Sequence, residues 1–251
     1  MEKTDIIPLL VGLALGTCLT TILIKRGFYR THPFFAVYVL SSVFGQILKL
    51  AVFRDYPLYF KVYWGTEAVY AILALLALHE VFRRVFRGFY LVYRWFRLLF
   101  PGVVGLTLAV TVWHALSDPP IQASPITAAI LLFAHGVSLM QVGAFCLLVL
   151  LADSLKLRWR YSALGVVLGF ALLGVGAAGA YWLRSKFGTK FGPVAKYAPP
   201  MAYMIANIVW LATFLRSEDE SKWPSDMTPE QLTDEIERDT MVLKRFKGKL
   251  K

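Results

Sequence analysis

The chain alternates between long apolar blocks and short polar connections. A helix needs about 20 mostly apolar residues to cross a bilayer, and seven blocks reach this length. They lie at about residues 6–24, 33–53, 58–82, 98–116, 125–151, 161–183 and 197–215. The pattern predicts an all-α polytopic membrane protein. Residues 1–215 form a bundle of seven transmembrane helices, and residues 216–251 form a linker and an amphipathic helix.

The connections differ in charge, and this difference predicts the orientation. Eleven Lys and Arg lie in the connections on one side of the predicted membrane, and six lie on the other side, the N-terminal segment included. Basic connections are retained in the cytoplasm. We therefore expect the N-terminus outside and the C-terminus in the cytoplasm, in a plasma (inner) membrane.

The amino-acid composition argues against a soluble protein. Hydrophobic residues make up 57% of the 251 residues and charged residues 17%, against about 45–50% and 25% in soluble domains. The net charge of +11 does not come from residues 216–251, which hold 8 basic and 9 acidic residues. Its position in the connections favours anionic lipid as a partner and excludes a nucleic-acid-binding domain.

Cysteine and histidine give no sign of a metal or cofactor. Cys18 and Cys146 both lie inside apolar blocks, where we expect them as buried packing residues. The four histidines show no metal-ligand spacing. No cofactor is evident, and we expect no metal site.

Ionisable side chains inside a bilayer are costly and indicate function by default. Glu67 lies about 13 Å into the third span, with Tyr63 and Tyr70 on the same face. In the second span Ser42, Gln46 and Lys49 lie on one face at i, i+4 and i+7, and Lys49 can reach Glu67 if the two helices are neighbours.

Further polar residues lie at a similar depth, namely His135 in the fifth span, and Asn207 with Tyr203 in the seventh. Two interpretations follow. In one, spans two, three, five and seven enclose a polar, ligand-binding cavity. In the other, Lys49 and Glu67 only lock two helices together, while His135 and Asn207 form hydrogen bonds across helices.

Two segments near membrane surfaces have distinct patterns. The stretch from Arg83 to Arg97 is rich in Phe, Tyr and Arg, and predicts a helical hairpin whose aromatic rings lie at headgroup level. Glu80 is expected to pair with Arg83 or Arg84 where the third helix ends. Pro199 and Pro200 are expected in the first turns of the seventh helix.

The C-terminal tail contains a capped helix. Thr228, Pro229 and Gln231 form an N-terminal capping pattern. An apolar face follows, composed of Leu232, Ile236, Leu243, Phe246 and Leu250. This face predicts docking either to the membrane surface or to a cytoplasmic or membrane protein.

The topology resembles that of rhodopsins and G-protein-coupled receptors, which also have seven spans with the N-terminus outside. The resemblance is architectural. The segment from Tyr197 to Leu215 contains no lysine for retinal and no Asn-Pro-x-x-Tyr motif. The third span ends in Glu-Val-Phe-Arg-Arg instead of Asp-Arg-Tyr. Fold analogy alone implies no function.

These patterns favour a non-enzymatic membrane protein, because the spans lack a nucleophile–base set, paired acids or metal ligands near an interface. We expect a small-molecule-binding or sensing bundle, or an accessory subunit of a larger complex, that contacts a partner through its tail. The alternative is a proton- or ion-linked transporter in which Glu67 titrates.

Overall fold

The computed structural model describes residues 6–117, 125–155, 161–187 and 192–216, together with Asp234, Glu237 and Met241 of the tail. Side chains within these helices are described except at positions 91–92, 114–117, 125–135, 181, 184–187 and 192–196. The tail positions predicted to dock, and Lys156, the nearest base to Asp153, lie outside the described residues.

Seven described helices are long and apolar enough to cross a membrane, which confirms the predicted all-α, seven-helix architecture. They are α1 (Ile6–Lys25), α3 (Pro33–Ala51), α4 (Tyr56–Val85), α6 (Phe96–Ser117), α7 (Pro125–Ser154), α8 (Tyr161–Phe187) and α9 (Gly192–Arg216). The short helices α2 (Phe28–Thr31) and α5 (Arg87–Val92) lie in connections. The side of the membrane on which each terminus lies stays a prediction.

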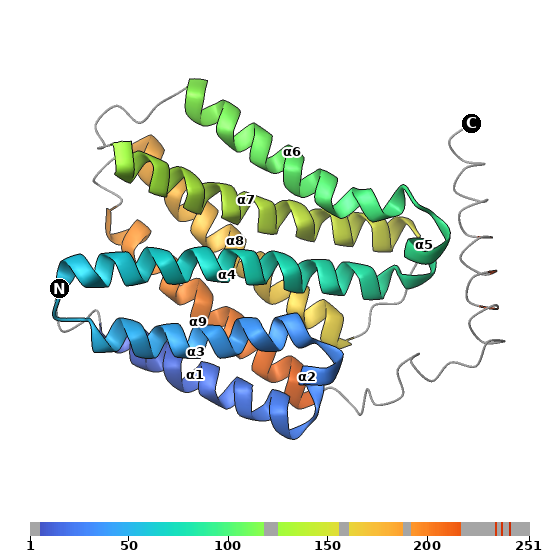
Figure 1. The fold of residues 1–251 in the computed structure, drawn as a ribbon, viewed down its shortest axis with the longest axis horizontal. Helices are drawn as coiled ribbons and strands as arrows, with labels where there is room; N and C mark the ends of the chain where they lie inside the picture. Colours follow the sequence, from blue (N-terminus) through green and yellow to red (C-terminus); the bar gives the residue numbers. More distant parts are fainter. Residues whose placement is uncertain are drawn as a thin grey trace.

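Five of the long helices form a ring. α1 packs against α3, α3 against α4, α4 against α8, α8 against α9, and α9 against α1. α7 packs against both α4 and α8, and α6 packs against α7. Figure 1 shows α6 at one edge of the bundle and α1 at the opposite edge. We call the end where α1 begins, α3 ends and α4 begins the outer end, and the opposite end the inner end.

Polar groups satisfy the ends of several helices. Asp55 precedes α4, and its side chain accepts a hydrogen bond from the Leu58 amide at 3.2 Å, which is a local N-cap. The inner end of α9 is held by the turn that follows α1, because the Arg26 guanidinium donates to the carbonyl oxygens of Phe214 (2.9 Å) and Leu215 (3.0 Å). A cation suits this end of the helix dipole.

Glycines of α8 allow its neighbours to approach closely. A Cβ at Gly169 would overlap the Trp210 indole of α9, and one at Gly165 would overlap Thr213. Gly174 instead contacts α7 at Ser138 and its neighbours. Small residues serve this purpose in membrane helices. The glycine-rich sequence of α8 therefore forms tight seams with two helices.

The start of α9 and the corner between α4 and α6 differ from expectation. α9 begins at Gly192, so Pro199 and Pro200 lie in its interior and not in its first turns. The helix extends beyond the apolar block because helix formation itself does not require apolar residues.

At the corner between α4 and α6, Phe86, Phe89 and Phe96 are buried against one another. The corner folds back on the bundle, so these three rings pack in the protein interior and are not exposed on its surface.

Both cysteines are exposed on the bundle surface, so the expectation that they are buried was wrong. Cys18 lies on α1, whose buried positions are Gly12, Gly16, Leu19 and Leu23. The rest of that helix is also apolar, because its surface faces lipid in a membrane. An apolar neighbourhood in the sequence therefore does not identify a buried side chain.

Candidate functional site

An ion pair between α3 and α4 lies in the outer half of the ring. The Lys49 ammonium donates to Oε1 of Glu67 at 2.9 Å. Lys49 is two residues from the C-terminal end of α3, where a cation interacts favourably with the helix dipole. The sequence predicted that Lys49 reaches Glu67 if their two helices are neighbours, and the structure shows this contact.

Two tyrosines of α4 enclose the ammonium group. The Lys49 nitrogen lies 4.6 Å from the ring centre of Tyr63 and 5.2 Å from that of Tyr70. Both distances are within the range of a cation–π interaction, which strengthens when water is excluded. Because Tyr63, Glu67 and Tyr70 are spaced at i, i+4 and i+7, one face of α4 supplies all three groups.

The two members of the ion pair differ in accessibility. The Lys49 side chain is only 4% exposed, whereas the Glu67 side chain is 38% exposed. Carboxylate Oε1 is bonded to Lys49, and Oε2 has no hydrogen-bond partner among the described residues. The accessible member of the pair is therefore an acceptor.

Glu67 lies on a face of α4 that is buried in the bundle further inward. The exposed positions in the central turns of α4 are Gly65, Val69, Ile72 and Leu76. Glu67 is rotated by about 140–180° from each of them, at roughly 100° per residue. It shares its face with Ala71, Ala74 and Leu78, which are all buried. Nearer the outer end the same face carries Phe60, which is exposed, so the carboxylate lies where this face of α4 changes from exposed to buried.

Tyrosines from opposite sides of the ring converge on Ser42 of α3. The Tyr203 hydroxyl of α9 donates to Ser42 Oγ at 2.9 Å, and Ser42 Oγ donates to the Val39 carbonyl at 2.8 Å. The Tyr70 hydroxyl of α4 donates to the Ser42 carbonyl at 3.4 Å. The space for this hydroxyl is provided by Gly45, since a Cβ there would overlap it. Ser42 therefore connects three helices.

Gln46 lies beside this network with an unsatisfied group. A Cβ added to Gly12 of α1 would meet Gln46 Nε2 at 3.3 Å and the Tyr203 ring at 3.2 Å, so these two side chains flank the glycine. Gln46 Oε1, in contrast, is buried and has no partner among the described residues.

The remaining predicted residues do not join this contact set. Asn207 is buried, but its amide donates to the Tyr203 carbonyl of its own helix at 2.8 Å, so this bond does not cross helices. His135 is in α7, which packs against α4, α6 and α8, and its side chain lies outside those described. The structure instead adds Ser42, Gly45 and Gly12, of which only Ser42 had a sequence signal, the i, i+4, i+7 spacing with Gln46 and Lys49.

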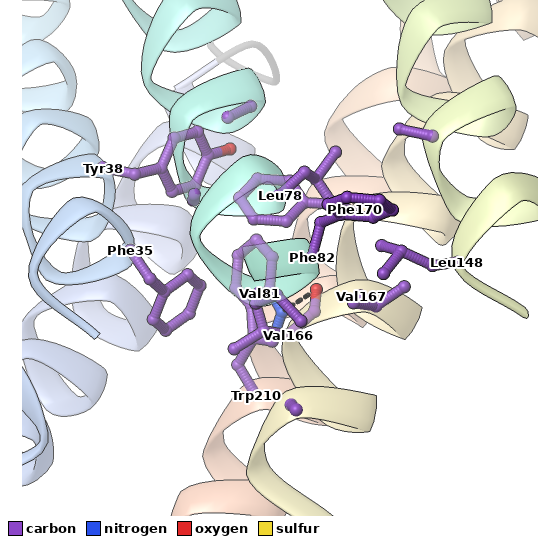
Figure 2. Close-up of a cluster of buried hydrophobic side chains, with 14 of the residues drawn as sticks. Phe35, Tyr38, Leu78, Val81, Phe82, Leu148, Val166, Val167, Phe170 and Trp210 are labelled. Atoms are coloured by element: carbon purple, nitrogen blue, oxygen red, sulfur yellow. Dashed lines mark hydrogen bonds between the residues drawn. The ribbon is translucent and has the colours of Figure 1, made fainter. Parts of the chain in front are cut away.

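Aromatic side chains fill the ring on the inner side of this network. Phe35 and Tyr38 of α3 contact Trp210 of α9 with ring centres 5.1 and 5.9 Å apart, and Phe170 of α8 contacts Trp210 at 5.2 Å. Figure 2 shows these rings with Leu78, Val81 and Phe82 of α4 and Leu148 of α7. The Trp210 indole donates to the Val166 carbonyl at 3.3 Å. We call the four rings of Phe35, Tyr38, Phe170 and Trp210 the aromatic layer.

A second carboxylate lies at the inner end of α3 and α4. Glu80 accepts a hydrogen bond from the Phe34 amide at 3.0 Å and pairs with Arg84 at 3.1 Å. The pairing with Arg84 agrees with the sequence prediction. The cap on α3 was not predicted, because a residue 46 positions away provides it. Since His32, the residue before α3, supplies no side-chain cap, Glu80 satisfies a free amide of this helix.

Among the described side chains, no three His, Cys, Asp or Glu residues are grouped closely enough to hold a metal ion. Comparison of the chain with protein-family models, with curated proteins and with solved structures gave no match.

Proposed function

We propose that this multi-pass membrane protein is a non-enzymatic binding or sensing protein whose small-molecule site surrounds Lys49 and Glu67. The observation that supports this most is the partly accessible carboxylate of Glu67 beside a fully enclosed Lys49. A pair that served only to join α3 and α4 gains nothing from an exposed carboxylate, since an unsatisfied charged group in a membrane is costly.

The aromatic layer favours binding over passage through the bundle. Phe35, Tyr38, Phe170 and Trp210 are all buried, and they join α3, α8 and α9 directly inward of Ser42. Close-packed rings leave no route for a hydrated solute. A site that opens on the outer side of such a layer has one entrance, as expected for a receptor or sensor.

A proton- or ion-linked transporter is the second candidate, because an accessible intramembrane carboxylate is the group that such proteins titrate. In that case the aromatic layer must open during the cycle. Solute flux into proteoliposomes distinguishes the two candidates, since a binding protein gives ligand occupancy without flux.

The proposal is tested with the full-length protein purified in native lipid. Small molecules that co-purify are extracted and identified by mass spectrometry, and the wild type is compared with the double variant Lys49→Met/Glu67→Gln. The double variant removes both charges but keeps the side-chain volumes, so the bundle should remain folded. Loss of one co-purifying compound in this variant is the expected result.

The matched control is Lys61→Met, which removes a lysine from an exposed position of α4. It should keep the compound. If the double variant is folded and retains every compound found with the wild type, the Lys49–Glu67 region is not the binding site. The ion pair then serves only to join the two helices.

A further inference from the structure

Two oxygen atoms of the site are available to accept hydrogen bonds from a ligand. Lys49 donates to Glu67, Tyr203 donates to Ser42, and Ser42 donates to Val39. Two oxygens have no partner among the described residues, namely the accessible Glu67 Oε2 and the buried Gln46 Oε1. Gln46 is more than nine-tenths buried, and buried carbonyl groups are nearly always satisfied. A ligand that completes this network must therefore supply hydrogen-bond donors.

The charges of the site disfavour ionic ligands. An anion would approach the exposed carboxylate of Glu67, which repels it, and it cannot reach the enclosed Lys49 ammonium. A cation would have to share one carboxylate with Lys49, and the two positive charges would repel each other. A neutral donor avoids both penalties, and its hydrogen bond to a charged acceptor is of the stronger kind.

Aromatic rings extend from the ion pair toward the outer end. Tyr63, whose ring faces Lys49, stacks with Tyr59 at 6.2 Å between ring centres, and Tyr59 contacts Phe53 at 6.1 Å. Ring faces and edges of this kind accommodate apolar and aromatic groups. The surroundings of the polar atoms therefore suit a ligand that is largely apolar.

We propose that the site at Lys49 and Glu67 binds a neutral molecule that presents a hydroxyl or amide donor on an apolar, aromatic body. This inference rests on the proposed function, because it specifies the ligand class of the same site. The donor contacts Glu67 Oε2, and a second donor, where the ligand has one, satisfies Gln46 Oε1 one helical turn further inward.

Four probes with the same benzyl group test the inference. They are benzyl alcohol, benzyl methyl ether, benzylammonium and benzoate. Their binding to the full-length protein in lipid nanodiscs is measured by saturation-transfer NMR, with empty nanodiscs subtracted to remove partitioning into lipid. We expect saturable binding of benzyl alcohol and about tenfold weaker binding of the ether, which lacks one hydrogen bond to a charged acceptor.

The variants locate the effect. In Lys49→Met/Glu67→Gln the preference for the alcohol over the ether should become smaller, because the acceptor at residue 67 is no longer charged. Gln46→Leu should weaken a probe with two donors, 3-hydroxybenzyl alcohol, more than it weakens benzyl alcohol. The control Gln141→Leu removes a buried glutamine of α7. It should not change the binding of benzyl alcohol or of 3-hydroxybenzyl alcohol.

The contrary results are distinct. Stronger binding of benzylammonium or benzoate that depends on Lys49 and Glu67 would overturn the neutral ligand class and leave the proposed function standing. Equal binding of alcohol and ether would overturn the donor requirement. Absence of saturable binding by all probes would overturn the inference, whereas the proposed function is decided separately by the compounds that co-purify.

Discussion

Lys49 and Glu67 have different surroundings, and this difference predicts different effects for their variants. Lys49→Met removes the partner of a carboxylate that lies inside the bundle, so the melting temperature in detergent should fall. In Lys49→Met/Glu67→Gln the stranded charge is absent, and more than half of the loss should be recovered. The non-additivity measures the coupling between the two side chains.

Lys61→Met serves as the control for this cycle, because it is the same replacement at an exposed position of α4. We expect a change within about 0.5 kcal/mol, as for other surface substitutions. Losses in the single variants that simply add in the double variant would show that Lys49 and Glu67 do not interact in the membrane.

At the level of helices, Gly169 is one of the glycines on which the α8–α9 seam depends. The Trp210 indole occupies the space in which a Cβ of residue 169 would lie. Gly169→Ala should therefore destabilise the bundle by roughly 1–3 kcal/mol, the usual cost of overpacking. Gly179→Ala, in the same helix but with no atom within 4 Å of the new Cβ, should be neutral or slightly stabilising, since alanine favours helix. Thermal denaturation of both variants checks this contrast. Equal effects would show that Gly169 is not needed for the packing of α8 against α9.

The cap that Glu80 provides to α3 is a second contact between helices with a measurable effect. Glu80→Ala removes the acceptor for the Phe34 amide and the partner of Arg84. We expect a loss of about 1–3 kcal/mol. Hydrogen exchange should also become faster in the first turn of α3, as measured by mass spectrometry on peptides from that region.

Glu237→Ala is a suitable control for this exchange experiment, because it removes a carboxylate from an exposed helical position of the tail. Exchange in the first turn of α3 should not change in this variant. Unchanged exchange in Glu80→Ala as well would mean that the hydrogen bond to Phe34 does not protect this turn.

For the whole molecule, the orientation predicted from the positive charge of the connections is testable by labelling. Cys18 and Cys146 are first replaced by serine, since both are exposed. Single cysteines at Arg94 and Lys251 should then react only after the membrane is permeabilised, whereas one at Asp118 should react from outside. The reverse pattern would invert the bundle and place Glu67 in the cytoplasmic half.

The tail should be separable from the bundle. The guanidinium of Arg26 holds the end of α9 at Phe214 and Leu215, before the tail begins. Deletion of residues 226–251 should therefore leave the protein inserted and its melting temperature nearly unchanged. If the predicted face of Leu232, Ile236, Leu243, Phe246 and Leu250 docks a partner, co-purification of that partner should be lost. Loss of the protein from the membrane would instead show that the tail stabilises the fold.

The sequence by itself determined the number of spans and their approximate bounds, because the thickness of the hydrocarbon core imposes a local requirement of about 20 apolar residues. It also determined that Lys49 and Glu67 lie at depths where they can meet, since depth follows from position along a helix. Both are properties of a segment and need no knowledge of its neighbours.

Only the tertiary structure decided which side chains surround the ion pair. Tyr203 and Tyr70 meet at Ser42, and Gly12 lies against Gln46, because α1 and α9 close the ring beside α3. In a membrane helix the lipid-facing and the buried surfaces are both apolar, so hydrophobic periodicity does not mark the face that packs. For the same reason the prediction that Cys18 and Cys146 are buried was wrong. The cap that Glu80 provides to α3 was not predicted, because the two residues of this hydrogen bond are 46 positions apart in the sequence.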